Sequence, residues 1–149
     1  MDDRFVLVDT NVLLSASTPA RVEHGDALRV LNEWPNEGFR LCTSGQILRE
    51  YLVVATRPLD QNGLAFSRED AASNVDALQT RMRLLNESPA VFARLRRLLD
   101  EVQCSGNQIH DANVVATALT HGVARICTGN VDDFERFNSY VEVVALSGA

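Results

Sequence analysis

The sequence predicts an α/β fold, a three-layer α/β/α sandwich around a central, mostly parallel sheet of four to five strands. Two observations support this prediction. Short apolar runs typical of buried strands alternate along the chain with longer segments of helical spacing, and this alternation is the pattern of a parallel sheet covered by helices. The chain has 149 residues and is 46% hydrophobic, which is enough for a real core, so we expect a single domain over residues 1–149.

The predicted strands are continuous apolar runs, as expected for strands that are covered on both faces. The first, RFVLVD, ends at the carboxylate of Asp9. The second, FRLCTS, leads directly into a helix, and the third, RLLNES, is short. In chain order the predicted strands occupy residues 4–9, 39–44, 83–88, 124–128 and 141–146. Because helical segments separate them, we expect the strands to run in the same direction.

The predicted helices are placed by capping residues and by apolar spacing. Ser44 is a typical N-cap, and Pro58 ends the same helix because the residue before a proline disfavours helical backbone. Ser67 and Asp70 form a capping-box-like start, and Pro89 begins an amphipathic helix. The predicted helical segments are residues 11–17, 21–34, 44–56, 67–82, 89–103 and 110–122, with a loop at 59–66 and a helical turn at 131–137.

Charge and composition exclude several classes of protein. The net charge of −6 argues against a protein that holds nucleic acid through a broad basic face. It does not argue against a nuclease whose acids hold divalent cations, because the metals offset the local charge. All 14 basic residues are arginines. P-loop NTPases and Schiff-base enzymes need a lysine, so both classes are excluded.

The cysteines and the chain termini indicate a cytoplasmic protein without a membrane segment. Cys42, Cys104 and Cys127 show no metal-binding spacing and are odd in number, which indicates a reducing compartment, with Cys42 and Cys127 in the core. No apolar run approaches the ~20 residues of a membrane span. Asp2 and Asp3 stand where a signal peptide is basic, so we expect no signal peptide.

Acidic residues follow the ends of two predicted strands. Asp9 ends the first strand, and Asp132 and Asp133 come shortly after the fourth. Open parallel sheets bind ligands beyond the carboxyl ends of their strands, so these side chains are candidates for one site. Glu50 lies within the helical segment ILREYLVV, and Asp111 lies in the first turn of another helix.

Each acid has a structural explanation when it is taken alone. Asp9 suits a helix cap, Asp111 suits the dipole of its helix, and the others suit a solvated surface. Together they suit Mg²⁺ or Mn²⁺, because carboxylate oxygens are hard ligands that repel one another without a cation. Such a centre activates water and stabilises charge on a phosphoryl group. The acids together therefore predict metal-assisted phosphodiester hydrolysis.

Four segments of the chain form an ordered set of motifs: VDTNVLL (Val8–Leu14), ILREYLVVATRP (Ile47–Pro58), IHDANVVATALTHGV (Ile109–Val123) and ICTGNVDDFERF (Ile126–Phe137). They resemble the motifs of PIN-domain ribonucleases, and most closely those of VapC-type toxins from bacterial toxin–antitoxin pairs. They occur in the order of the family and cover nearly the whole chain. The resemblance implies a PIN-like fold and a metal-dependent endoribonuclease.

The resemblance also implies roles for individual residues. Four acids match those that bind Mg²⁺ or Mn²⁺ and carry out catalysis, with Glu50 as a candidate proton acceptor. Three polar residues match groups that support the first acid and direct polar atoms at the site. The acids are Asp9, Glu50, Asp111 and Asp133, and the supporting residues are Thr10, Asn11 and Thr128.

The last motif departs from the family at one position. Asn130 stands where many members have an aspartate, so the site carries less negative charge and the number of metals, one or two, stays open. The choice between Asp132 and Asp133 also stays open. We prefer Asp133, because it is followed by Phe134, which would pack inward and fix the neighbouring acid.

The resemblance implies partners as well as a reaction. These are an RNA substrate, a cognate antitoxin and a second copy of the chain in a homodimer. Arg49 and Arg57 are candidates for contact with RNA. Residues 60–97 are expected to form a helical arm or clip that shapes RNA choice and partner contact.

Two other classes of protein fit part of the sequence. A PIN-like module that binds RNA or protein without catalysis is allowed by the Asn130 departure. A phosphotransfer enzyme or receiver domain also places an acid such as Asp9 at the end of a parallel strand. Such proteins normally need a lysine near the phosphoryl group, and this chain has none.

Overall fold

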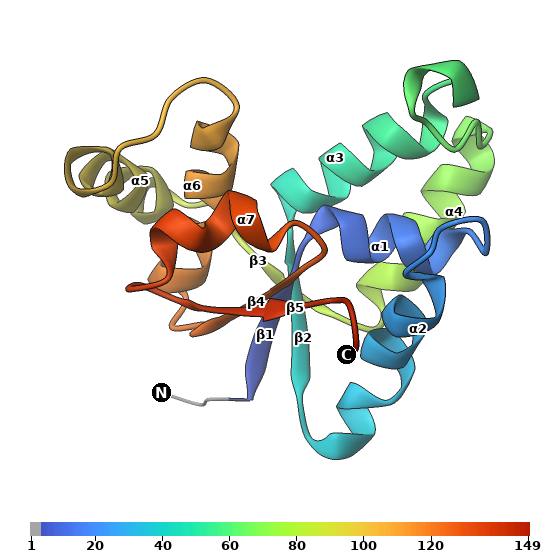
Figure 1. The fold of residues 1–149 in the computed structure, drawn as a ribbon, viewed down its shortest axis with the longest axis horizontal. Coiled ribbons are helices and arrows are strands. Elements are labelled where there is room, and N and C mark those ends of the chain that lie inside the picture. The colour runs from blue at the N-terminus through green and yellow to red at the C-terminus, as the bar shows by residue number, and fades with distance from the viewer. Residues whose placement is uncertain (1–3) are drawn as a thin grey trace.

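The protein has the predicted α/β architecture. Figure 1 shows it in the computed structural model, which describes residues 4–149. Five strands, all parallel, form one sheet in the order β3-β2-β1-β4-β5, which confirms the predicted strand number and direction. Residues 1–3, which include Asp2 and Asp3, lie outside the described part of the chain. The strands are β1 (Phe5–Val8), β2 (Arg40–Ser44), β3 (Arg83–Leu85), β4 (Arg125–Thr128) and β5 (Glu142–Ala145).

Helices cover both faces of this sheet. The chain moves outward from β1 to β3, returns to β4 on the other side of β1, and ends at β5. Because such crossovers are right-handed, the helices of the two halves lie on opposite faces, as Figure 1 shows. One face carries α1 (Thr10–Ser17), α2 (His24–Asn32), α3 (Gly45–Thr56) and α4 (Arg68–Gln79), and the other carries α5 (Pro89–Glu101), α6 (Gln108–Thr120) and α7 (Val131–Phe134).

The central strands are buried and form the switch point of the fold. Val6, Leu7 and Val8 of β1 and Ile126 of β4 are fully buried, as expected for strands packed by helices on both faces. β1 and β4 are neighbours, and the connections that follow them lie on opposite faces of the sheet. The carboxyl ends of β1 and β4 therefore form the position at which open α/β sheets bind ligands.

The predicted helix caps are present. The Ser44 hydroxyl accepts a hydrogen bond from the Ile47 amide at 3.3 Å, and the Ser67 hydroxyl accepts one from the Asp70 amide at 3.0 Å. Asp9 is the N-cap of α1. Each cap satisfies a backbone N–H that the helix itself leaves without a partner.

Several helix boundaries differ from the prediction. α2 spans residues 24–32 rather than 21–34, and α5 ends at residue 101 rather than 103. α4 ends at residue 79 rather than near 82, because the chain then enters β3 with Met82 buried in the core. α6 begins at residue 108 rather than 110. Gly106 adopts a left-handed conformation there, with φ of 59°, and the Gln108 side chain accepts a hydrogen bond from the Ser105 amide. Short 3₁₀ turns complete the fold at η1 (Trp34–Glu37), η2 (Leu59–Gln61) and η3 (Glu135–Phe137).

The stretch 60–97, predicted to act as a helical arm or clip, contributes to three parts of the fold. It contains α4, which packs against α3, and most of α5, which packs against α6. Between these helices, β3 pairs with β2 at the edge of the sheet. Its role in RNA choice stays a prediction.

The three cysteines are free thiols. Cys42 and Cys127 are fully buried in the sheet, as predicted. Burial raises the pKa of Cys42 to about 11 and that of Cys127 to about 12, because a thiolate loses its hydration there. Over residues 4–149, no helix is both long enough and apolar enough to cross a membrane.

Candidate active site

Asp9 lies where β1 ends and α1 begins, and several hydrogen bonds hold its carboxylate. Oδ1 accepts a bond from the Thr10 amide at 2.9 Å, and Oδ2 accepts one from the Thr128 hydroxyl at 2.9 Å. The Asn11 amide donates to the same Oδ2 at 3.2 Å. Asp9 is 8% exposed. Burial raises its pKa above the ordinary 3.8, because these hydrogen bonds offset only part of the lost hydration.

Asn11 links the ends of β1 and β4. Besides its bond to Asp9, its Nδ2 donates to the Thr128 hydroxyl at 3.3 Å, and its Oδ1 accepts from the Gly129 amide at 2.6 Å. A Cβ atom at Gly129 would lie 3.2 Å from that Oδ1 and 2.9 Å from a carboxylate oxygen of Glu23. A glycine therefore permits this close approach of backbone and side chains.

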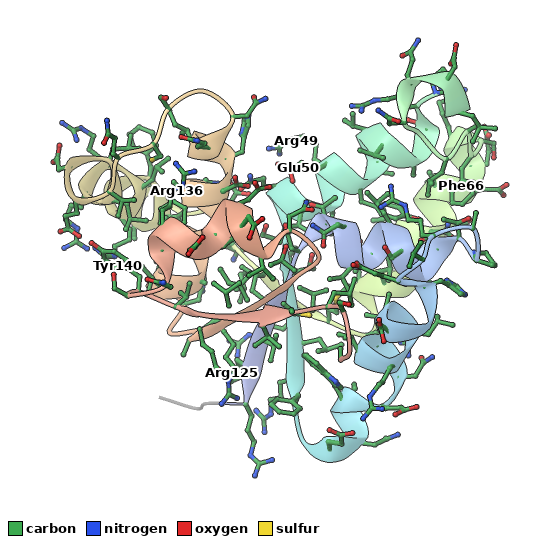
Figure 2. The ribbon with its side chains drawn as sticks, in the orientation of Figure 1. Arg49, Glu50, Phe66, Arg125, Arg136 and Tyr140 are labelled. Atoms are coloured by element: carbon green, nitrogen blue, oxygen red, sulfur yellow. The ribbon has the colours of Figure 1, made fainter. Side chains whose placement is uncertain are left out.

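Glu50 on α3 is the second acid at the carboxyl ends of the strands. Its Oε2 accepts a hydrogen bond from the Thr10 hydroxyl at 2.9 Å, and its Oε1 accepts one from the side-chain Nε2 of Gln46 at 3.0 Å. These two bonds orient the carboxylate beside the first turn of α1. Figure 2 shows Glu50 and its neighbour Arg49 near the start of α3, on the side of that helix toward α6 and α7.

Asp111 and Asp133 bring two further carboxylates from α6 and α7. The pKa of Asp111 is raised from 3.8 to about 7. Burial is the largest cause, followed by the negative charges of Asp133, Asp9 and Glu50. The guanidinium of Arg136 acts in the opposite direction. Four acids from distant segments are thus close enough for their charges to act on one another.

The four carboxylates suit a divalent cation in chemistry and charge. Carboxylate oxygens are the ligands that Mg²⁺ and Mn²⁺ prefer. After burial, the negative charges of Asp133, Asp9 and Glu50 are the causes that raise the pKa of Asp111, and a cation would offset those charges. Within residues 4–149, no three Asp, Glu, His or Cys side chains are already arranged around a single ion position.

The last motif is arranged around a buried phenylalanine. Phe134 is 1% exposed and packs inward, as predicted. Asp133, and not Asp132, is among the charges that raise the pKa of Asp111. Asn130 is exposed; its amide N–H donates to the Thr128 hydroxyl at 3.0 Å, and its carbonyl accepts from the Asp133 amide at 3.1 Å. These backbone bonds connect the last motif to the end of β4.

A groove of about 320 Å³ lies beside Glu50. It combines two arginines with an apolar floor, and both arginines are those for which the sequence predicts contact with RNA. A guanidinium binds phosphate oxygens through paired hydrogen bonds, so the groove suits a nucleic-acid backbone. Its lining residues are Thr10, Arg49, Glu50, Val53, Val54 and Arg57.

A set of polar side chains that the sequence motifs do not include lies next to these acids. Gln46 on α3 donates to Glu50, Asn113 on α6 donates to Gln46, and Glu87 accepts hydrogen bonds from both Gln46 and Asn113. Gln46 lies one helical turn before Glu50, and that spacing places both side chains on one helix face. The spacing could have identified Gln46, whereas no pattern in the sequence indicates Glu87 or Asn113.

Comparison with known proteins gives a family and a curated relative. The model of the family described as PIN domain matches residues 5–132. Ribonuclease VapC48 of Mycobacterium tuberculosis is 28% identical over 131 residues, which cover 87% of this chain and 89% of that protein.

Several solved structures share the fold. VapBC-1 from nontypeable Haemophilus influenzae gives a TM-score of 0.65 at 19% identity, over 96% of this chain and 98% of that chain. DNA-bound VapBC from Salmonella typhimurium gives 0.66 at 16% identity, over 95% and 97%. VapC20 of Mycobacterium tuberculosis, a toxin that cleaves the sarcin-ricin loop, gives 0.62 at 19% identity, over 93% and 98%. At these identities the likeness concerns the fold.

Proposed function

The chain belongs to the PIN-domain family, and from this premise we propose that it is a metal-dependent endoribonuclease, the toxin of a type II toxin–antitoxin pair. The observation that supports this best is the gathering of four acids at the switch point of the sheet. Burial, followed by the negative charges of Asp133, Asp9 and Glu50, raises the pKa of Asp111 there. The similarity to Ribonuclease VapC48 supports RNA as the substrate class.

In this proposal the four acids hold Mg²⁺ or Mn²⁺. When bound, the cation lowers the pKa of a water molecule and offsets the charge of the phosphate under attack. Asp9 suits the role of a fixed ligand, because three hydrogen bonds determine the orientation of its carboxylate. Asn130 supplies a neutral amide where an acid is common, so the count of metals stays open between one and two.

Glu50 suits the role of proton acceptor for the attacking water. Each of its two oxygens accepts one hydrogen bond from a neutral donor, Thr10 or Gln46. An ionised carboxylate oxygen has further acceptor capacity beyond one such bond, so either oxygen can take a proton from a water within hydrogen-bond reach. The groove beside Glu50, with Arg49 and Arg57, would hold the RNA backbone.

Asp9→Asn tests the catalytic assignment. The substitution keeps the size of the side chain and removes its charge, so we expect Mn²⁺-dependent cleavage of RNA to fall to the level seen in EDTA. Asp60→Asn is the matched control, because Asp60 is exposed in η2, and it should cleave like the wild type. If Asp9→Asn degrades RNA in Mn²⁺ as fast as the wild type, the assignment is wrong.

A cognate antitoxin is the partner expected under this proposal. Similar solved structures include a toxin–antitoxin complex and a member of the VapBC family of toxin–antitoxin systems. We expect the product of the neighbouring reading frame to co-purify with this chain and to inhibit its cleavage of RNA. Homodimer formation stays a prediction, which sedimentation of the purified chain would test.

A second candidate is a PIN-like module that binds RNA or protein without cleaving it. The neutral Asn130 favours this candidate, because it reduces the negative charge available to a metal. Such a module would bind no Mn²⁺ in a titration and would show no metal-dependent cleavage. Binding of Mn²⁺ together with cleavage would exclude it.

A further inference from the structure

We propose that Gln46 is a positioning residue of the active site, which fixes the carboxylate of Glu50 and links it to the start of α6. The inference rests on the proposed function, because it assigns Gln46 a role through an acid of the metal centre. It concerns a neutral side chain that none of the four family motifs contains, since the second motif begins at Ile47.

The side-chain amide of Gln46 donates both N–H groups of Nε2 to hydrogen bonds and accepts one hydrogen bond at Oε1. Nε2 donates to Glu50 Oε1 at 3.0 Å and to the backbone carbonyl of His110 at 2.9 Å. Oε1 accepts from Asn113 Nδ2 at 2.7 Å. The residue is 2% exposed, so water does not compete freely for these bonds and each of them constrains the amide.

The network allows only one orientation of this amide. The Glu87 carboxylate only accepts hydrogen bonds, so Asn113 must present its Nδ2 there, at 3.3 Å. The same Nδ2 faces Gln46, which must therefore present Oε1 and direct Nε2 at Glu50. If Gln46 were flipped, its oxygen would face the Glu50 carboxylate and the His110 carbonyl, both of which are acceptors.

The backbone around Gln46 is held as well. Its amide N–H, in the first turn of α3, donates to Glu87 Oε1 at 2.8 Å. This turn has no partner for that N–H within the helix, so Glu87 acts as a second cap beside Ser44. Glu87 and Asn113 therefore fix both the backbone and the side chain of Gln46.

The position of Gln46 connects two acids that come from opposite faces of the sheet. α3 and α6 lie on different faces, and the Gln46 amide contacts Glu50 on α3 and the carbonyl of His110, the residue before Asp111, on α6. The bond to His110 holds the first turn of α6 near α3. A single amide thus sets the relative position of Glu50 and Asp111.

A measurement of metal affinity distinguishes a positioning role from the alternative, in which the Gln46 network only provides hydrogen bonds to a buried amide. A residue that only satisfied its own polar groups would change folding stability when replaced, with no specific effect on a metal site. Partners that orient a metal ligand typically change metal affinity by about 10- to 100-fold when they are lost. The relevant measurement is therefore Mn²⁺ affinity, from the electron paramagnetic resonance signal of free Mn²⁺ in titrations of the folded chain.

The main variant is Gln46→Met, which keeps the length of the side chain and removes its hydrogen bonds. We expect its Mn²⁺ affinity to be about 10-fold weaker than that of the wild type. Gln79→Met is the matched control, because Gln79 is exposed at the end of α4, and it should leave the affinity unchanged. Urea unfolding of each variant shows whether it is folded under the titration conditions.

Two further variants extend the test, and the first of them keeps it decisive if Gln46→Met is poorly folded. Asn113→Ala leaves Gln46 in place but removes the donor that fixes its orientation, so a smaller loss of Mn²⁺ affinity is expected. Gln46→Met in the background of Glu50→Gln should cost less affinity than in the wild type, because residues that act through each other are not additive.

Each outcome separates this inference from the proposed function. If the wild type binds Mn²⁺ and cleaves RNA but neither Gln46→Met nor Asn113→Ala weakens binding, the positioning role is wrong and the proposed function stands. Equal losses from Gln46→Met with and without Glu50→Gln would also overturn the role. If the wild type binds no Mn²⁺, both the proposed function and the positioning role are wrong.

Discussion

The two ends of the sheet carry opposite kinds of side chain. At the carboxyl ends of the strands, here called the carboxyl edge, Asp9 and Glu50 lie with Asp111 and Asp133. Burial together with these like charges raises the pKa of Asp111 to about 7. At the amino ends of the strands, here called the amino edge, arginine side chains lie over aromatic rings. Arg40 and Arg83 each lie 5.5 Å from the centre of the Phe5 ring, and Arg125 lies 5.7 Å from that of Phe39.

The difference shows that the net charge of −6 conceals two opposite local charges. In a parallel α/β fold the helix N-termini point to the carboxyl edge and the C-termini to the amino edge, so each edge has the sign of charge that helix dipoles favour. The arginines also gain cation–π contacts, whereas the acids repel one another. The contacts at the amino edge therefore stabilise the fold. The repulsion between the acids at the carboxyl edge destabilises it, but the same acids form a site that can bind a cation.

The largest expected effect is at the carboxyl edge. Asp133→Asn should lower Mn²⁺-dependent RNA cleavage by at least about 10²-fold, the upper end of the range for lost support at a metal site. Asp132→Asn, at the neighbouring exposed position, should stay close to the wild type. Initial rates with one labelled RNA compare the two variants. A larger loss for Asp132→Asn would reverse the assignment of these two acids.

The second effect is a gain in the stability of the metal-free protein at high pH. The folded-state pKa of Asp111, about 7, lies above its ordinary 3.8. The folded state therefore favours the protonated carboxyl, and the stability that this carboxyl contributes is complete below about pH 4 and is lost as the pH rises through 7. Asp111→Asn cannot ionise. It should raise the free energy of unfolding at pH 8 by about 1–2 kcal/mol, a figure reduced for solvent screening of a half-exposed group.

Urea unfolding in EDTA at pH 4 and pH 8 measures this difference. The wild type and Asp111→Asn should be nearly equal at pH 4 and should diverge at pH 8. Saturating Mn²⁺ at pH 8 should reverse their order, because only the wild type keeps the full set of carboxylates. An equal stability of the two proteins at both pH values in EDTA would contradict the crowding of charge at this edge.

The third effect concerns RNA and compares one arginine from each edge. Arg49→Met, in the groove beside Glu50, should weaken RNA binding by about fivefold, or about 1 kcal/mol. It should also reduce the slope of log K against log salt by about 1, since one phosphate contact is lost. Arg83→Met, at the amino edge, should leave both quantities unchanged. Fluorescence anisotropy with a catalytically inactive Asp9→Asn background allows the measurement without cleavage.

The smallest expected effect is at the amino edge. Arg40→Met removes one guanidinium from the Phe5 ring and should lower the free energy of unfolding by about 0.5 kcal/mol, the value of an exposed cation–π contact. Its Mn²⁺ affinity should match that of the wild type. A change in Mn²⁺ affinity without a change in stability would show that the two edges are not separate in function.

The framework of this fold could be predicted because each element has a local cause. The apolar run of β1, the Ser44 cap and the proline at 58 act within a few residues, and all of them have the predicted effect. The boundary of α6 was missed because it depends on a left-handed glycine, Gly106, and on a side-chain contact of Gln108. Such details depend on three-dimensional geometry that apolar spacing does not encode.

The candidate site could be predicted only in part. Asp9 and Asp133 follow strand ends, where the topology of a parallel sheet brings groups together. Gln46, Asn113 and Glu87 contact one another across 26 to 67 positions of sequence. Amide side chains occur in many solvated positions, so nothing in their local pattern distinguishes a buried network from an exposed surface.

The hydrogen bond between Asp9 and Thr128 has a consequence for synthesis of the chain. It joins residues 119 positions apart, and contacts of such separation form late in folding. During translation Asp9 leaves the ribosome early, but β4 and the last acid follow only near the end. A nascent or truncated chain that lacks β4 therefore contains Asp9 but lacks Thr128, which holds the carboxylate of Asp9 in the folded protein. Any nuclease activity of this protein would begin only when its synthesis is nearly complete.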